Sequence, residues 1–393
     1  MISLVKKSLQ LELHSFMQIA SKKHKSISNS AYNQARMKIK PELFKHFIHA
    51  LNKQFYTDND ERVVLWNNFR LLACDGSTII LPITKELAKK HAHAVNQNTT
   101  DVLLARTSIL YDLENELVLD GTLVPFSTGE RELAVSQIKG LEKSGYQELI
   151  LLDRGYPSFD LMYQLNKIKV SYVMRIKHSF SAVTKEFMES DLIDLQTEIK
   201  PGKNVSLLRK LYTRQQSIKV RLIKVLLNTG EIELLITSLT DETLFANTVF
   251  KELYCKRWGI ETVYDKLKNK LQIENFTGYS EVSILQDFYC TLFLSNIQSL
   301  LVNEANQELK NKQISNKKYE YKINANLSIG FIKTRLVELF LEESKTQNIL
   351  LELEKLFIKN VIPIRPNRSF ERNTFKYRTR KKPSITKNFK QAF

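Results

Sequence analysis

Two aspartates stand where apolar runs of the sequence end. Asp75 directly follows residues 69–74, and Asp153 directly follows residues 149–152. A carboxylate at the end of a buried strand is costly unless something compensates its charge, and two on neighbouring strands repel each other. A divalent cation such as Mg²⁺ removes that repulsion, because hard cations prefer carboxylate oxygens. Either aspartate alone also fits a simple turn, since Asp-Gly and Asp-Arg-Gly are turn-forming sequences.

A third acidic residue lies in a segment predicted to form one long helix, residues 245–271. Each residue of a helix is rotated by about 100° around the axis from the one before it. The side chains of Tyr254, Arg257, Glu261 and Lys268 then lie within about 60° of one another around that axis. An acid flanked by two cations and a phenol suits a metal ligand beside a phosphate backbone. The alternative is an exposed helix face on which Arg257 and Glu261 form a salt bridge four residues apart.

The elements that must position these residues follow a recognisable order. Strands are predicted at 69–81, 107–111, 117–126, 149–152 and 170–176, and helices at 130–143 and 158–167. An antiparallel start followed by alternating helices and strands predicts an α/β protein with a mixed sheet and helices on its faces. The ribonuclease-H-like fold has this order.

The flanking segments predict further regions around that core. Strands are expected at 205–208, 218–227 and 231–239, and mainly helix at 280–358. The predicted division is 1–60, a helical N-terminal region and candidate DNA-binding module; 61–179, the first part of a ribonuclease-H-like core; 180–243, an inserted β subdomain; 244–300, the rest of the core with the helix of Glu261; and 301–393, a helical C-terminal region with a basic tail.

The charge of the chain is concentrated at its ends. The net charge is +17, of which residues 1–40 carry +7 and residues 365–393 carry +9, so the segment between them is nearly neutral. Aromatic residues are interleaved with the C-terminal cations. Basic ends of this kind indicate a polyanionic partner, with nucleic acid favoured over an acidic membrane, although solvated tails would have the same composition.

Several classes of protein are excluded by motifs that the sequence lacks. There is no G-x-G fingerprint, P-loop, His-Glu-x-x-His or Gly-x-Ser-x-Gly motif. The three cysteines form no CxxC pair and predict a reducing compartment. The first residues contain no signal-peptide core. The most apolar stretch, residues 284–302, is interrupted by polar residues and predicts a buried helix rather than a membrane span.

Three segments of the sequence together resemble bacterial insertion-sequence transposases with a DDE triad. They are LACDGS at 72–77, LLDRGY at 151–156 and YCKRWGIET at 254–262. The most similar branch is the insertion sequence four (IS-four) family, whose hallmark Tyr-x2-Arg-x3-Glu-x6-Lys is matched at all four positions. The resemblance covers roughly residues 25–375, and the separation of Asp153 from Glu261 fits the β domain that this branch inserts before its catalytic glutamate.

This resemblance implies an activity and the residues that perform it. The expected reaction is cut-and-paste excision and strand transfer of an insertion sequence, without ATP. The catalytic and metal-binding residues would be Asp75, Asp153 and Glu261, holding two Mg²⁺ or Mn²⁺ ions. The residues expected to contact DNA are Tyr254, Arg257, Lys268, Arg154 and Trp258.

The resemblance also implies partners and a location. They are double-stranded DNA with terminal inverted repeats, a target DNA, and a second copy of the chain in the DNA complex, with no membrane. A bacterial cytoplasmic protein, associated with the nucleoid when bound to DNA, is expected.

Two points stay open at the level of sequence. Relatives that form a DNA hairpin use a tryptophan of the inserted domain, whereas this chain has only Trp66 and Trp258, neither within 180–243. Tyr212 or Phe245 are candidate substitutes. The alternatives to an active transposase are a ribonuclease-H-like nuclease that joins nothing and an inactive relic that only binds DNA. The three intact acidic positions argue against the relic.

Overall fold

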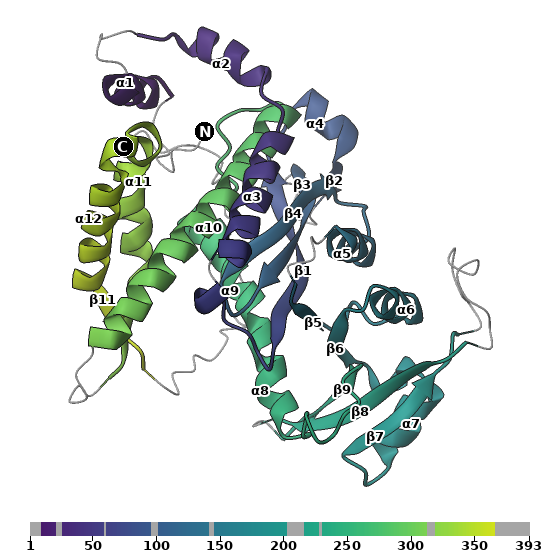
Figure 1. Ribbon diagram of the computed structural model, residues 1–393. Helices are drawn as coiled ribbons and strands as arrows, with labels where there is room; N and C mark the ends of the chain where they lie inside the picture. Colours follow the sequence, from purple (N-terminus) through teal and green to yellow (C-terminus); the bar gives the residue numbers. More distant parts are fainter. Residues whose placement is uncertain are drawn as a thin grey trace.

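A computed structural model of the chain describes residues 9–20, 26–58, 60–95, 101–140, 145–202, 216–227, 230–312 and 319–365. Within these residues a nine-stranded sheet forms the centre of the molecule (Figure 1). Its strands are β1 (Phe69–Leu81), β2 (Ala92–Val95), β3 (Asp101–Asp112), β4 (Leu117–Pro125), β5 (Gln147–Leu152), β6 (Ser171–Ile176), β7 (Asp194–Ile199), β8 (Ile218–Leu226) and β9 (Ile232–Thr237).

The strand order is β2-β3-β1-β5-β6-β9-β8-β7, and β4 pairs with β3 beside β2. The β1–β5 and β5–β6 pairs are parallel, and the other pairs are antiparallel. The path β4-β3-β1-β5-β6, with an antiparallel meander leading into parallel strands, is the ribonuclease-H-like arrangement. The predicted α/β mixed sheet is therefore confirmed.

Helices cover both faces of this sheet. Those next to the strands are α3 (Glu42–Asp58), α4 (Lys85–Lys90), α5 (Glu130–Lys139), α6 (Phe159–Lys167), α7 (Ala182–Glu189), α8 (Val249–Cys255), α9 (Gly259–Asp265) and α10 (Glu281–Lys312). Figure 1 shows α5 and α6 side by side on one face, with α8, α9 and α10 on the other. Short 3₁₀ turns lie at Asp60–Arg62, His178–Phe180 and Glu343–Lys345.

The alternation of side chains along β1 decides which residues meet which helices. Leu72 and Cys74 belong to the core cluster that includes α5 and α6. Ala73 points to the other face, into the cluster formed with α9 and α10. Because successive side chains of a strand point to opposite faces, Asp75 emerges on the face of Ala73, toward the helices that carry Glu261.

The segment predicted as an inserted β subdomain, 180–243, contributes α7 and strands β7, β8 and β9. These strands continue the central sheet, since β9 pairs antiparallel with β6. The expected strand at 205–208 lies outside the described residues. The proposed domain boundaries remain a prediction.

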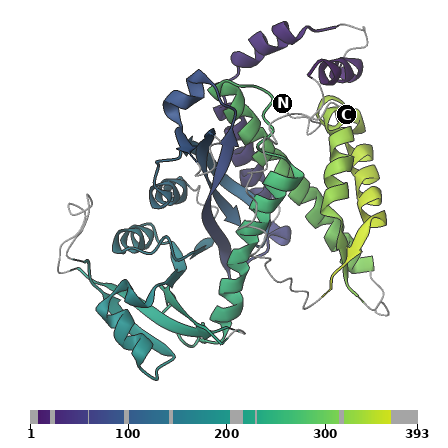
Figure 2. The ribbon, with the colours of Figure 1, turned by 180° about the vertical axis from the view of Figure 1, so that it is seen from behind.

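Two further groups of helices flank the core. The N-terminal helices α1 (Leu9–Ala20) and α2 (Asn29–Met37) lie beyond α3, while α11 (Ala325–Leu341) and α12 (Thr346–Lys359) pack on α10, as both views show (Figures 1 and 2). A small ribbon of β10 (Tyr321–Ile323) and β11 (Val361–Pro363) closes this C-terminal group. None of the helices in the described residues is long and apolar enough to cross a membrane.

A buried arginine joins the N-terminal helices to the core. Arg36 of α2 is 3% exposed and donates hydrogen bonds to Gln286 Oε1 at 2.7 Å and Ser283 O at 2.8 Å. Its guanidinium also forms an ion pair with Asp287 Oδ1 at 2.9 Å. An ion pair this buried is costly to break, because either partner alone would be an uncompensated charge in the interior. Arg36 therefore fixes α2 on the start of α10.

Candidate active site

The two aspartates lie close together on adjacent parallel strands: Asp75 is within β1, two residues beyond the last residue that pairs with β5, and Asp153 directly follows β5. In the β1–β5 ladder Ala73 is paired with Leu151. Asp75 and Asp153 each follow their paired residue by two positions, so they emerge at the same level and on the same face. The predicted position of Asp153 at a strand end is confirmed, whereas Asp75, expected to end a strand, lies in the middle of β1, which continues to Leu81 in its ladder with β3.

The environment of Asp75 disfavours its negative charge. The pKa of this carboxyl is raised to about 6, mainly by burial and also by the neighbouring charges of Asp153 and Glu130. The amide of Gly76, which donates to Asp75 Oδ1 at 2.8 Å, and the Arg257 guanidinium act in the opposite direction. A cation beside this pair of acids would relieve both the desolvation and the repulsion.

The helix that carries Glu261 is less regular than predicted. The expected single helix over 245–271 begins at Val249 and consists of α8, a 3₁₀ turn at Lys256–Trp258, α9 and a π-turn at Lys266–Lys270. The predicted long helix is therefore present from Val249 onward, but its pitch changes twice along its length. A helical wheel cannot detect such changes of pitch, because it assumes 100° per residue throughout.

Tyr254 and Arg257 of this segment face the strand ends. Tyr254 is 5% exposed, and its hydroxyl donates to Leu152 O at 3.3 Å and to Asp153 Oδ1 at 3.5 Å. Arg257 is also 5% exposed and donates to Glu261 Oε1 at 3.2 Å. The salt bridge anticipated as an alternative therefore forms, with a buried guanidinium on one side and a Glu261 side chain that is 41% exposed on the other.

Arg257 connects the three acids electrostatically. Burial works against its charge, but Tyr254, Asp153 and Glu261 outweigh that effect and raise the pKa of Arg257. Its guanidinium carbon lies 5.0 Å from the ring centroid of Trp258. The buried Nε of Arg257 has no acceptor within the part of the chain that the structure describes. The cation is thus held beside the acids with one of its donors unsatisfied.

Lys268, the fourth residue of the predicted stripe, contacts the strand of Asp75. Its ammonium donates to Ser77 Oγ at 2.8 Å and to Thr78 O at 2.7 Å. Arg154 and Trp258, the other predicted DNA-contacting residues, are exposed beside the site, Trp258 by 46%. The contacts therefore bring Tyr254 to Asp153 and Lys268 to the strand of Asp75, while Glu261 is joined to them only through Arg257.

The structure adds residues that the sequence did not single out. Tyr264, three residues after Glu261, donates its hydroxyl to Asp75 O at 2.8 Å. Glu130, at the start of α5, forms an ion pair with Arg106 and lies so close to Gly76 that a Cβ there would stand 3.0 Å from its carboxyl carbon. A tyrosine in a helix and an acid in a first helical turn are too common to signal a site.

α5 also supports the second aspartate. Arg131, next to Glu130, donates from Nε to Gly155 O at 2.9 Å. Gly155 lies two residues after Asp153, so the start of α5 contacts the segments that follow both aspartates. This contact joins residues far apart in the sequence, and no local pattern predicts it.

The acids fit a divalent cation in part. Carboxylates are the ligands that Mg²⁺ and Mn²⁺ prefer, and the raised pKa of Asp75 shows a site that a cation would stabilise. No group of three or more His, Cys, Asp or Glu side chains stands close enough to hold a metal ion among the residues described. Glu261 would have to exchange its bond with Arg257 in order to complete the set.

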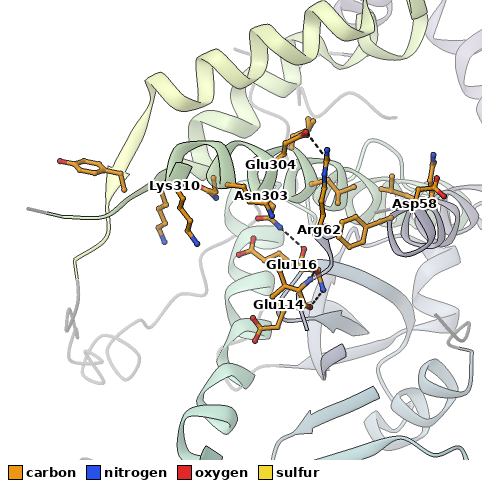
Figure 3. Close-up of a pocket in the computed structure, with 18 of the residues that line it drawn as sticks. Asp58, Arg62, Glu114, Glu116, Asn303, Glu304 and Lys310 are labelled. Atoms are coloured by element: carbon orange, nitrogen blue, oxygen red, sulfur yellow. Dashed lines mark hydrogen bonds and ion pairs between the residues drawn. The ribbon is translucent and has the colours of Figure 1, made fainter. Parts of the chain in front are cut away.

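The structure also contains a cavity of about 590 Å³, which lies away from these acids (Figure 3). It is bounded by α3, α10, β10 and the turn after β3, and it contains none of Asp75, Asp153 or Glu261. Acids and bases alternate around it, and Arg62 forms a salt bridge with Glu304 at 3.2 Å across one wall. The candidate site is therefore not this cavity but the region around Asp75 of β1 and Asp153 at the end of β5.

Comparisons with known proteins identify the family of the chain. A family model described as "Transposase DDE domain" matches residues 66–297. No curated protein matches the chain. One similar solved structure is a cryo-EM structure of the piggyBac transposase synaptic complex with hairpin DNA, with 13% identity and a TM-score of 0.41 over 79% of this chain. The match covers 62% of the piggyBac chain, so this chain spans less than two thirds of that protein.

Proposed function

Because the chain belongs to the family of transposase DDE domains, we propose that it excises an insertion sequence from DNA and joins it to a target by metal-dependent strand cleavage and strand transfer. The observation that carries this proposal is a pair of aspartates on adjacent central strands beside a buried arginine that bonds a third acid. Asp75 and Asp153 are this pair, and Arg257 links them to Glu261.

Asp75, Asp153 and Glu261 are the proposed catalytic and metal-binding residues. Divalent cations bound to such carboxylates supply two effects, activation of an attacking oxygen and neutralisation of charge on the leaving oxygen. The role of the protein is to hold its acids in place. Tyr264 fixes the main chain at Asp75, and Tyr254 fixes the end of β5 at Leu152 and Asp153.

The basic residues around the acids are proposed to hold the DNA backbone. Arg154 and Trp258 are exposed and suited to direct contact, by charge and by stacking on a base. Arg257 adds positive charge beside the acids, which favours a phosphate there. Lys268 lies at the strand of Asp75. The hydroxyl of Tyr254 is engaged by the protein, so we propose that Tyr254 positions Asp153 more than it contacts DNA.

We also propose the finer features that the sequence implies. They are membership of the bacterial IS-four branch, recognition of terminal inverted repeats, two metal ions and a homodimer in the DNA complex. The basic ends of the chain support binding to a long polyanion.

A strand-transfer assay tests the proposal. Purified protein is incubated with a duplex that bears the terminal repeat of the element, a target duplex, and Mg²⁺ or Mn²⁺. We expect end cleavage and joined product, both abolished by chelator and by Asp153→Asn. Asp265→Asn, on the exposed side of α9, is the matched control and should retain activity. Cleavage without joining would support a simple nuclease, and binding without cleavage would support a DNA-binding relic.

A further inference from the structure

A π-turn follows Glu261 in the catalytic helix. It spans Lys266–Lys270 and is closed by a hydrogen bond from the amide of Leu271 to Lys266 O at 2.9 Å. A π-turn is less favourable than an α-helix and persists where other contacts hold it, often at functional sites. The contacts made by its first and third residues identify what holds this one.

Lys266 ties the turn to α10. Its ammonium donates to Ser295 O at 3.1 Å and to Ser299 Oγ at 3.0 Å. Both acceptors are uncharged, and no ion pair of Lys266 is present among the residues described. Burial lowers the pKa of Lys266 to about 8; the charge of Glu116 partly counteracts burial, while Lys270 adds to it. A cation enclosed in this way is costly to keep.

The side chain of Lys268 extends from the opposite side of the same turn. Residues two apart in a helix point in nearly opposite directions, so while Lys266 reaches α10, Lys268 reaches Ser77 and Thr78 of β1. Those acceptors lie two and three residues beyond Asp75. The turn is therefore clamped between α10 and the strand that carries the first aspartate.

We propose that Lys266 is a positioning residue of the catalytic helix, which fixes the π-turn to α10 and thereby seats Lys268 against β1 beside Asp75. Lys266 itself lies on the side of the helix away from the acids and contacts none of them. The proposal rests on the proposed function, in which Lys268 faces the DNA.

The first test needs no catalytic activity. Lys266→Met keeps an unbranched side chain of similar length but removes the ammonium, and Lys270→Met in the same turn is the matched control. We expect hydrogen–deuterium exchange at the Leu271 amide to become about tenfold faster in Lys266→Met and to stay unchanged in Lys270→Met. Unchanged exchange in Lys266→Met would overturn the clamp, and this result stands even if the wild-type protein cleaves no DNA.

The second test separates positioning from general stability. Lys266→Met should unfold at the same temperature as the wild type or higher at neutral pH, because a buried charge has been removed. Strand cleavage should nevertheless fall about tenfold. In a Lys268→Ala background the same substitution should cost less than about twofold, since residues that act through one another are not additive. A lower melting temperature, or an additive loss in the double variant, would overturn the proposal.

Discussion

Asp75 combines the features expected of a metal-binding carboxylate before metal binds. Its pKa is raised to about 6 by burial and by two neighbouring acids, and it is held in place through its main chain by Tyr264. The same features make the residue a source of instability without a cation. Two measurements follow from this, one on the protein alone and one with metal.

Asp75→Asn is expected to stabilise the metal-free protein at neutral pH. Because the folded pKa is about 6 and the ordinary value 3.8, the unfolded chain loses this proton first as pH rises. The charged carboxyl therefore lowers the free energy of unfolding increasingly from about pH 4 to pH 6, and by its full amount above about pH 6. Removing the charge should raise the free energy of unfolding by about 1–2 kcal/mol at pH 7.5, and by nothing below about pH 4. Urea denaturation in chelator, beside Asp265→Asn, measures this, and a less stable Asp75→Asn would contradict it.

Metal affinity is expected to fall as the pH falls through about 6. A carboxylate must lose its proton before it can bind a cation, so each pH unit below the pKa of Asp75 should weaken binding by up to about tenfold. Titration with Mn²⁺, followed by the loss of its free electron-paramagnetic signal from about pH 5 to 7.5, measures the affinity. Asp153→Asn serves as the weakened control. An affinity that does not change over this range would exclude Asp75 as a ligand.

Arg257→Lys is expected to impair cleavage despite keeping the charge. The planar guanidinium bonds Glu261 and lies over the ring of Trp258, whereas an ammonium cannot make both contacts together. Loss of one preorganised donor lowers cleavage on the order of 10²–10³-fold. Single-turnover cleavage measures the effect. Arg335→Lys, on the remote helix α11, is the control, and equal rates for the two variants would argue against the role.

Sequence patterns located the acids but not their support. The patterns brought Asp75 and Asp153 onto adjacent strands and put Tyr254 and Arg257 beside them, because strand alternation and helical spacing are local properties. Tyr264, Glu130 and Arg131 were missed. Their significance comes from contacts with main-chain atoms of other segments, which no spacing along the chain expresses.

At the scale of elements, the main difference from expectation is the pitch of the catalytic helix. Periodicity correctly indicated helix, yet the 3₁₀ and π segments are set by tertiary contacts such as that of Lys266 with α10. The strands β8 and β9 were anticipated, whereas their addition to the edge at β6 was not, since pairing between distant strands leaves no local pattern.

The contact of α10 with β4 offers a matched test of packing. A Cβ at Gly121 would stand 2.3 Å from Leu292 Cδ1, whereas a Cβ at Gly330 of α11 meets nothing within 4 Å. Gly121→Ala should therefore destabilise the protein by about 1–3 kcal/mol through overpacking. Gly330→Ala should stabilise it by up to about 1 kcal/mol, because alanine is the better helix former. Thermal denaturation compares the two, and the opposite order of stability would contradict the packing.

At the scale of the whole molecule, the charge of +17 is not all available to DNA. Arg36, counted among the N-terminal cations, is buried against Asp287. The C-terminal cations at 365–393 lie outside the described residues except for Arg365. The net charge of an end therefore overstates its capacity to bind phosphate, and only binding measurements separate the two.

Removal of residues 366–393 should weaken DNA binding mainly at low salt. For every phosphate that the truncated chain no longer neutralises, the plot of log affinity against log salt concentration should become shallower by roughly 0.9. Fluorescence anisotropy at several salt concentrations measures the slope for the truncated and full-length chains. Asp153→Asn, which keeps the C-terminal residues, should have the full-length slope. Identical slopes for the truncated and full-length chains would show that these cations bind no phosphates.

The ion pair between Arg36 and Asp287 also has a consequence in time. The two residues are 251 positions apart, and a ribosome adds about 5–20 residues each second. The N-terminal helices thus leave the ribosome tens of seconds before the residues that fix them have been made. A chain that ends before Asp287 contains Asp75 and Asp153 but cannot form this ion pair, so α2 is anchored only after the start of α10 has been made.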